Sequence, residues 1–270
     1  MSPSAGISGR GRAELARVLA SGSRFIRPSD VVDALSVDAD AAAKRLARWA
    51  EDGWLRRVRR GLYIGVPVEA VNPEAWSEDA LLVAAEVWSP CYFTGWTAAN
   101  HWALTEQVFR TTVLKTAGRV RTSSVQLLDH DYTVGHAAED GLTWGLATEW
   151  REDARLRFAD PARTVVDILD TPRLGGGIRH GAEVLVAYLD EQESARLVEY
   201  GDRLGNRAIF KRLGYLIETL GLEFPDLVAR CRERISSGIS ALDPDGPDGG
   251  ARAGRWGLRV NVAVVNEGAS

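Results

Sequence analysis

The sequence is poor in cysteine and has no long hydrophobic run. Cys91 and Cys231 are the only cysteines, and they lie far apart without the spacing of metal ligands. Two such residues can build neither a disulfide framework nor a zinc knuckle, so we expect buried thiols in a cytoplasmic protein. No stretch of about 18 apolar residues occurs, and MSPSAGISGRGRAEL at the start has no apolar core. We therefore expect neither a membrane span nor a signal peptide.

Catalytic motifs are missing as well. The run Gly175–Gly177 belongs to no G-x-G-x-x-G or Walker pattern, and no serine stands in a G-x-S-x-G elbow. The carboxylates Glu149, Glu152 and Asp153 lack the lysine of a nuclease D…E-x-K pattern. The segment Asp129–Asp131 places a histidine between two aspartates, but a turn is the better interpretation than a metal site. We predict that the protein is not an enzyme and has no catalytic residues, metal or cofactor.

Negative charge exceeds positive charge overall, but the first 66 residues are basic. The formal net charge is −4, which argues against a nucleic-acid partner. Residues 1–66, however, hold twelve Lys and Arg against seven Asp and Glu, a balance of +5. Residues 67–270 have a balance of −9. This asymmetry favours a basic module that faces DNA, fused to an acidic body.

Residues 11–66 have the pattern of a helix-turn-helix, and residues 1–10 before them are predicted to be disordered. After a helix at about Gly11–Ala20, Pro28 stands where proline is tolerated in the first turn of a second helix. Asp38, in the turn that follows, is placed to cap a third helix. We expect this third helix over Ala39–Ala50, with a buried side made of Ala43, Leu46, Ala47 and Ala50.

A hairpin follows the predicted helices. Gly53 is typical of a left-handed helix cap. Trp54, Leu55 and Val58 suit a first strand, Leu62–Ile64 suit a second, and Arg59-Arg60-Gly61 suits the turn between them. Helix, helix and basic hairpin in this order predict a winged helix-turn-helix domain.

The basic residues of this module are the candidate DNA contacts. Those on the third helix, with Asp40 beside them, are expected to face the major groove, where base edges are read. Those on the hairpin are expected to contact phosphates or the minor groove. A wing can also mediate protein contacts, so the distribution of roles stays open. The predicted DNA-binding set is Lys44, Arg45, Arg48, Arg56, Arg57, Arg59 and Arg60.

The remainder is predicted to be a linker at 67–75 and a larger mixed α/β domain at 76–265. An apolar helix is expected over Trp76–Trp88, and a helix with Asp160 as N-cap over Ala162–Leu169. Strands that come first and helices that come later favour an α+β fold over a doubly wound sheet. The predicted strands are Tyr92–Thr94, Thr111–Lys115, Ser124–Leu128, Tyr132–Val134, Thr143–Glu149, Arg155–Phe158 and Trp256–Val260. The other predicted helices are Thr97–Leu104, Ile178–Leu189, Glu191–Leu204, Arg207–Leu220 and Pro225–Arg234, and Leu242–Arg255 is predicted to be a loop.

Three segments of the larger domain carry a resemblance. FTGWTAANHWALTEQ (Phe93–Gln107), DPARTVVDILDTPRLGGGI (Asp160–Ile178) and the late R-W-x-L-R-V strand (Arg255–Val260) follow the winged helix in that order. In this order the chain, over about residues 11 to 260, resembles the AbiEi family. These are antitoxins of the abortive-infection AbiE systems, known as type IV toxin–antitoxin systems.

The resemblance implies a protein with two activities. Its winged helix would bind inverted repeats in double-stranded DNA upstream of its own operon and repress it. Its larger domain would counteract a toxin that resembles a nucleotidyltransferase, without needing a tight complex. Two alternatives stay open: an enzyme on nucleotides or nucleic acid that the winged helix targets, and a ligand-responsive regulator without a toxin. The sequence does not decide between monomer and dimer.

Overall fold

The computed structural model describes residues 9–20, 22–67, 70, 72 and 76–264. It is a mixed α+β fold with two compact units, which confirms the predicted class. One unit comprises Met1–Val87 together with Gln126–Asp131, and the other comprises Trp88–Val125 and Tyr132–Ser270. The functional boundary that the sequence suggests at 67–75 stays a prediction, and most of those residues lie outside the described part of the chain.

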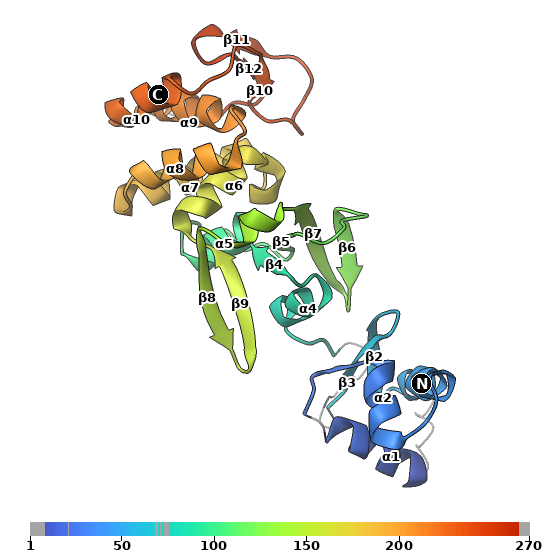
Figure 1. Ribbon diagram of the computed structural model, residues 1–270. Helices are drawn as coiled ribbons and strands as arrows, with labels where there is room; N and C mark the ends of the chain where they lie inside the picture. The colour runs from blue at the N-terminus through green and yellow to red at the C-terminus, as the bar shows by residue number, and fades with distance from the viewer. Residues whose placement is uncertain (1–8, 21, 68–69, 71, 73–75, 265–270) are drawn as a thin grey trace. The chain divides into compact units, whose positions relative to one another are not determined.

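The first unit begins with helices around a small antiparallel sheet of order β1-β3-β2 (Figure 1). Its core contains Leu15, Ile26, Val31, Leu46 and Leu55, at least one residue from each of α1, β1, α2, α3 and β2. The elements are α1 (Gly9–Leu19), β1 (Phe25–Ile26), α2 (Pro28–Leu35), α3 (Ala39–Glu51), β2 (Leu55–Arg59), β3 (Leu62–Gly65) and α4 (Ala80–Val87).

Several local predictions for this unit hold and three are wrong. Pro28 stands in the first turn of α2, and the Asp38 side chain caps α3 by accepting from Ala41 N at 2.7 Å. The predicted disorder over 1–10 is wrong for Gly9 and Arg10, which belong to α1, whereas residues 1–8 lie outside the described residues. The helix expected at Trp76 begins only at Ala80, where Asp79 accepts from Leu81 N at 2.7 Å.

The buried face of α3 also differs from the prediction. Ala42, Leu46 and Trp49 point into the core, at the i, i+4, i+7 spacing of one helix face. Ala43 and Ala47, which were expected inside, are exposed. Alanine fits either side of a helix, so the bulky Trp49 determines the rotation of α3 about its axis.

The second unit contains a six-stranded mixed sheet of order β6-β7-β5-β4-β9-β8. The central pair β4–β5 is antiparallel, and each of these strands has a parallel neighbour, β9 and β7 respectively. The β6–β7 turn alone is grouped with the first unit. The strands are β4 (Cys91–Phe93), β5 (Thr112–Thr116), β6 (Ser124–Leu127), β7 (His130–His136), β8 (Leu146–Arg151) and β9 (Ala154–Ala159).

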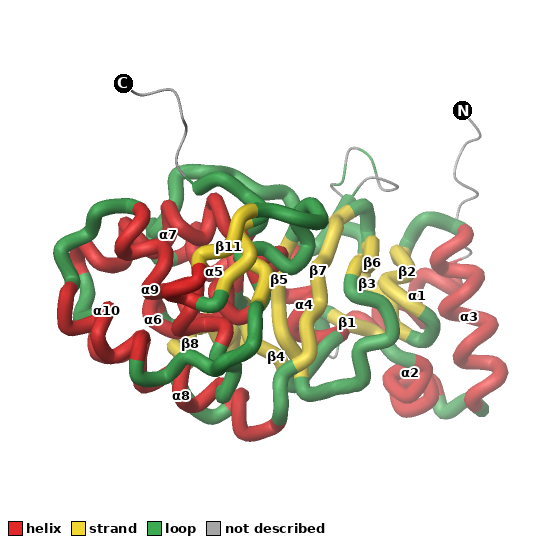
Figure 2. Tube along the Cα trace, turned by 90° about the horizontal axis from the view of Figure 1, so that it is seen from above, coloured by secondary structure: helices red, strands yellow, loops and turns green. Residues whose placement is uncertain are grey.

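Helices gather on one side of this sheet, as the views in Figures 1 and 2 both show. They share a large apolar core that also contains Trp256 and Leu258 from the end of the chain. None of the described helices is long and apolar enough to cross a membrane. The helices are α5 (Gly95–His101), α6 (Pro161–Asp170), α7 (Ile178–Glu191), α8 (Ala195–Leu204), α9 (Ala208–Thr219) and α10 (Pro225–Arg232), with short 3₁₀ turns η1 (Glu139–Leu142), η2 (Pro172–Gly175) and η3 (Gly254–Trp256).

A second small sheet covers the end of the helical region, in the order β10-β12-β11. Its strands are β10 (Ser240–Ala241), β11 (Ala251–Ala253) and β12 (Leu258–Val260). The predicted loop Leu242–Arg255 is therefore wrong at its end, because β11 lies inside it and Arg255 is in η3. The Asp/Gly/Pro-rich composition on which the loop was predicted extends only to Gly250. The strand that follows was missed because three residues are too few to show a periodic pattern.

The distinctive segments of the sequence pack against one another in this unit. A Cβ on Gly95, whose φ is +56°, would lie 2.0 Å from the Leu174 carbonyl oxygen. Close approach of these two backbones thus requires glycine. A Cβ on Gly175 would lie 2.7 Å from Ile168. The Gly-Trp-x-Ala segment therefore lies against the turn that ends the Asp-Pro-x-Arg-Thr segment.

Candidate nucleic-acid interface

An ion pair connects α3 to α1. It involves Arg45, one of the predicted DNA contacts. Arg45 Nε lies 3.1 Å from Glu14 Oε2 of α1, and Arg10 Nε lies 3.2 Å from the other Glu14 oxygen. The hydrogen bond from Arg45 lowers the pKa of Glu14, so the carboxylate stays charged. The guanidinium of Arg45 is therefore engaged between two helices.

Lys44 and Arg48 are differently placed. Both are exposed, and within the described residues the side chain of Lys44 has no hydrogen-bond or ion-pair partner. Arg48 is 81% exposed and has only a long contact, 3.9 Å, to Asp52 one turn later. Asp40 lies on the same exposed surface of α3. These side chains can reach a ligand that approaches α3.

The β2–β3 hairpin contains a β-bulge that presents its arginines. The register with β3 shifts between Arg57 and Arg59, so that Leu55 and Val58 are both buried although they are three residues apart. Arg57, Arg59 and Arg60 are exposed, and their side chains have no partner among the residues that the structure describes. Gly61, at φ +75°, provides the left-handed position of the turn.

Arg56 is turned away from these three. Its side chain is only 18% exposed, and it donates to the Trp76 carbonyl at 2.5 Å and to the Asp129 carboxylate at 2.9 Å. Of the seven predicted contacts, five have guanidinium or ammonium groups directed to solvent and two, Arg45 and Arg56, already have protein partners. Whether any of the seven touches DNA stays a prediction.

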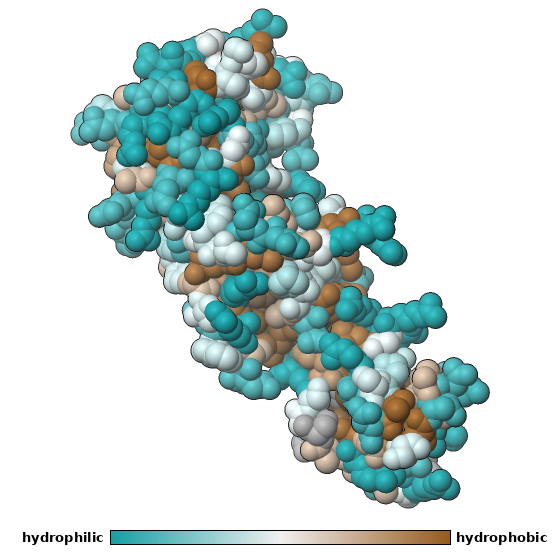
Figure 3. All heavy atoms as spheres, in the orientation of Figure 1, coloured by the Kyte–Doolittle hydropathy of each residue, from teal (hydrophilic) through white to brown (hydrophobic). Residues whose placement is uncertain are grey.

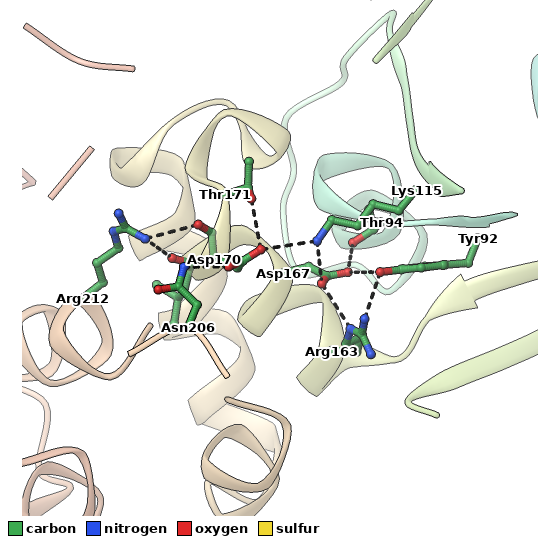
Figure 4. A network of polar contacts seen from close by, with 10 residues as sticks. Tyr92, Thr94, Lys115, Arg163, Asp167, Asp170, Thr171, Asn206 and Arg212 are labelled. Carbon is green, nitrogen blue, oxygen red and sulfur yellow. Dashed lines mark hydrogen bonds and ion pairs between the residues drawn. The ribbon is translucent and has the colours of Figure 1, made fainter. Parts of the chain in front are cut away.

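The second unit contains a buried polar cluster that sequence reasoning missed. The Asp167 side chain has no exposed surface and accepts from Tyr92, Thr94, Lys115 and Arg163 over 2.7–3.1 Å (Figure 4). Burial alone would raise the pKa of Asp167, but the charges of Lys115 and Arg163 outweigh it and lower the pKa. The cluster is buried, and it links β4 and β5 to α6.

The two other candidate clusters lie on strands and turns of the large sheet. Glu149 pairs with His101 Nε2 at 2.9 Å, and Glu152 stands at φ +55° in the β8–β9 turn. The Asp129–Asp131 segment begins in a turn, as predicted, and continues into β7. Among the described residues, no group of three or more His, Cys, Asp or Glu side chains is placed to hold a metal ion.

The comparisons with known proteins agree with the N-terminal resemblance. Residues 13–64 match the family model described as "Transcriptional regulator, AbiEi antitoxin". The match covers α2, α3, β2 and most of α1 and β3, and it includes all seven predicted contacts. No curated protein matches the chain. In fold, the chain resembles the crystal structure of the RV2827C protein from Mycobacterium tuberculosis, with a TM-score of 0.61, 17% identity and coverage of 91% of this chain and 90% of that one.

Proposed function

We propose that this protein is a DNA-binding antitoxin that represses its own operon from the cytoplasm. The observation that carries the proposal is the group of exposed cations Lys44, Arg48, Arg57, Arg59 and Arg60, all of them within the segment 13–64 that matches the regulator family. Arg57, Arg59 and Arg60 of the hairpin have no counter-ion among the described residues, as expected for side chains that bind phosphates, whereas Arg56 is paired with Asp129.

The first unit would act as a winged helix. Support comes from the element order, with α2 and α3 joined by a short turn and followed by the β2–β3 hairpin. In this arrangement α3 enters the major groove, and Asp40, Lys44 and Arg48 read base edges. Arg57, Arg59 and Arg60 of the hairpin contact phosphates beside the groove. These contacts fix the position of the protein on the DNA without reading its sequence.

The second unit would perform the antitoxin role and has no enzymatic activity of its own. Support comes from the resemblance of its segments Phe93–Gln107 and Asp160–Ile178 to the AbiEi family and from the burial of the charge cluster around Asp167, since the matching family model covers only residues 13–64 of the first unit. The expected target is a nucleotidyltransferase-like toxin encoded beside this gene, which the second unit counteracts without a stable complex. Co-expression with that toxin is expected to restore growth, and deletion of the first unit is expected to abolish repression only.

A titration of fluorescent promoter DNA tests the DNA-binding part. The triple variant R57A/R59A/R60A is expected to bind all DNA sequences more weakly. The negative slope of log affinity against log salt concentration is expected to become shallower by about 2.7, roughly 0.9 per lost phosphate contact. R57K/R59K/R60K, which keeps the charges, is expected to retain most of the affinity. Unchanged binding by the alanine variant would refute the proposed role of the hairpin.

A further inference from the structure

Two arginines on the last small sheet stand directly opposite each other. Arg252 of β11 pairs with Arg259 of the central strand β12, and Ala241 of β10 completes the row across the sheet. Both arginines are exposed. Like charges in directly opposed cross-strand positions destabilise a sheet. The sheet therefore keeps an unfavourable pair at a surface position where almost any residue would fit.

No carboxylate of the described residues compensates this pair. Within the described residues, the side chains of Arg252 and Arg259 have neither an ion pair nor a hydrogen bond. The loop between β10 and β11 carries Asp243, Asp245 and Asp248, none of which is bonded to either arginine. Asp243 instead accepts from Ile178 N at 2.8 Å and is buried.

Two further cations lie under the same strands. Lys211 of α9 is fully buried and donates to the Gly238 carbonyl just before β10, and Arg212 donates to the Ala241 and Leu242 carbonyls at 3.1 and 3.0 Å. Neither forms an ion pair with a described carboxylate. Burial lowers the pKa of each; the charge of Arg212 acts in the same direction on Lys211, whereas the charges of Asp170 and Asp243 act in the opposite direction on Arg212. Two cationic side chains thus lie beneath the sheet, and two arginines occupy its exposed positions.

We propose that Arg252 and Arg259 form an anion site for phosphodiester groups of a nucleic acid, a second contact beyond the winged helix. Guanidinium groups side by side can donate several charge-assisted hydrogen bonds to one phosphate. The row holds only these arginines and an alanine, so it lacks the aromatic anchor that protein interfaces favour. The visible face at this end of the chain is hydrophilic over the helices and mixed at the tip, where some apolar residues show among polar ones (Figure 3).

This site explains what the late R-W-x-L-R-V segment does. Trp256 is buried against Gly214, and Arg255 pairs with Glu218 at 3.0 Å. Leu258 is buried as well. Arg259 is the charged residue of the segment that packing does not use, and it is available to a ligand.

The test compares R252A/R259A with R119A/R121A, which removes two exposed arginines from the loop between β5 and β6 of the same unit. Binding is measured in the full chain, with promoter duplex in one arm and a single-stranded RNA of equal length in the other. The first variant is expected to reduce the magnitude of the salt slope by about 1.8 if the duplex is the ligand, or by about 1.4 if the single strand is. Its melting temperature is expected to stay the same or rise, because a repulsive pair is removed.

The outcomes separate this inference from the proposed function. Equal losses in both variants, or no loss in R252A/R259A, would overturn the anion site while leaving the winged helix untouched. A wild-type chain that binds RNA through Arg252 and Arg259 but binds no duplex would keep the site and remove the proposed operator binding. Loss of binding together with a lower melting temperature, unrestored in R252K/R259K, would show a structural role and overturn the inference.

Discussion

Glu14 on α1 and Arg45 on α3 are joined by an ion pair of 3.1 Å that ties the first helix to the proposed recognition helix. Both side chains are partly accessible, at 15% and 30%, so the pair contributes modestly to stability. We expect E14A to lower the free energy of unfolding by about 0.5 kcal/mol. A double-mutant cycle with R45A, followed by urea unfolding, measures the coupling.

Because Arg45 is engaged with Glu14 and Arg48 is not, the two arginines are expected to differ in DNA recognition. R48A is expected to weaken binding to the operator more than to unrelated DNA, since Arg48 is free to reach base edges. R45A is expected to weaken both to a similar and smaller extent, through the position of α3. Competition titrations with the two DNAs give the ratio, and a larger specificity loss in R45A than in R48A would contradict this division.

Asp167 is expected to be the most sensitive charged residue of the second unit. Its replacement by alanine leaves Arg163 buried without a counter-charge and Lys115 with only the longer contact to Asp170 at 3.6 Å, which costs roughly 3–5 kcal/mol. T94V removes one neutral donor from the same carboxylate and is expected to cost about 1 kcal/mol. Guanidinium unfolding of the two variants checks the order, and similar values would show that the cluster is not dominated by charge.

This cluster also predicts how stability depends on pH. The pKa of Asp167 is lowered in the folded protein, so its contribution is present above the unfolded pKa of about 3.9 and is lost as pH falls through the folded value. Unfolding measured between pH 3 and pH 7 is expected to show stability falling towards the acid end. In D167N the dependence is expected to be weaker in this range, whereas an identical dependence would assign it to other carboxylates.

Two glycines with positive φ allow the cost of the backbone conformation to be separated from the cost of a steric clash. Gly95 and Gly205 both have positive φ, +56° and +73°, but only Gly95 has backbone atoms where a Cβ would stand. We expect G205A to cost about 1 kcal/mol from the conformation alone. G95A is expected to cost roughly 3 kcal/mol or more, because the clash with Leu174 is added. Thermal unfolding of both variants beside the wild type measures the two losses of stability.

The two thiols are expected to be inert in the folded state. Burial raises the pKa of Cys91 to about 11 and that of Cys231 to about 12, so neither forms thiolate at pH 8. A thiol reagent at this pH is expected to modify both only after unfolding. Rapid modification of either one in the native protein would show that its helix or strand opens locally.

Features that depend on neighbouring residues were predictable, and those that depend on distant ones were not. The caps at Asp38 and Asp160 follow from a side chain and a backbone amide three residues apart. The α+β order of strands and helices follows from local periodicity. Within the Asp167 cluster only the pair with Arg163, four residues away, is local; Tyr92, Thr94 and Lys115 lie 52 to 75 positions away, and no spacing in the sequence reveals their contacts.

The candidate interface shows the same limit. The exposure of Arg57, Arg59 and Arg60 follows from their crowding in one hairpin. The inward turn of Arg56 depends on Trp76, twenty residues later, and the engagement of Arg45 depends on Glu14, 31 residues earlier. The rotation of α3 was mispredicted because alanines on every side of that helix made its pattern ambiguous.

The interlocked glycines of the second unit bear on how relatives of this protein should be recognised. Gly95 and Gly175 are required by close contacts between segments, and Asp160 and Asp167 by a cap and a buried charge. A sequence signature built on these residues therefore reports that a chain has the same scaffold. Proteins found with it can differ in what they bind and in what they do, and those differences will lie in the solvent-facing residues that the signature leaves out.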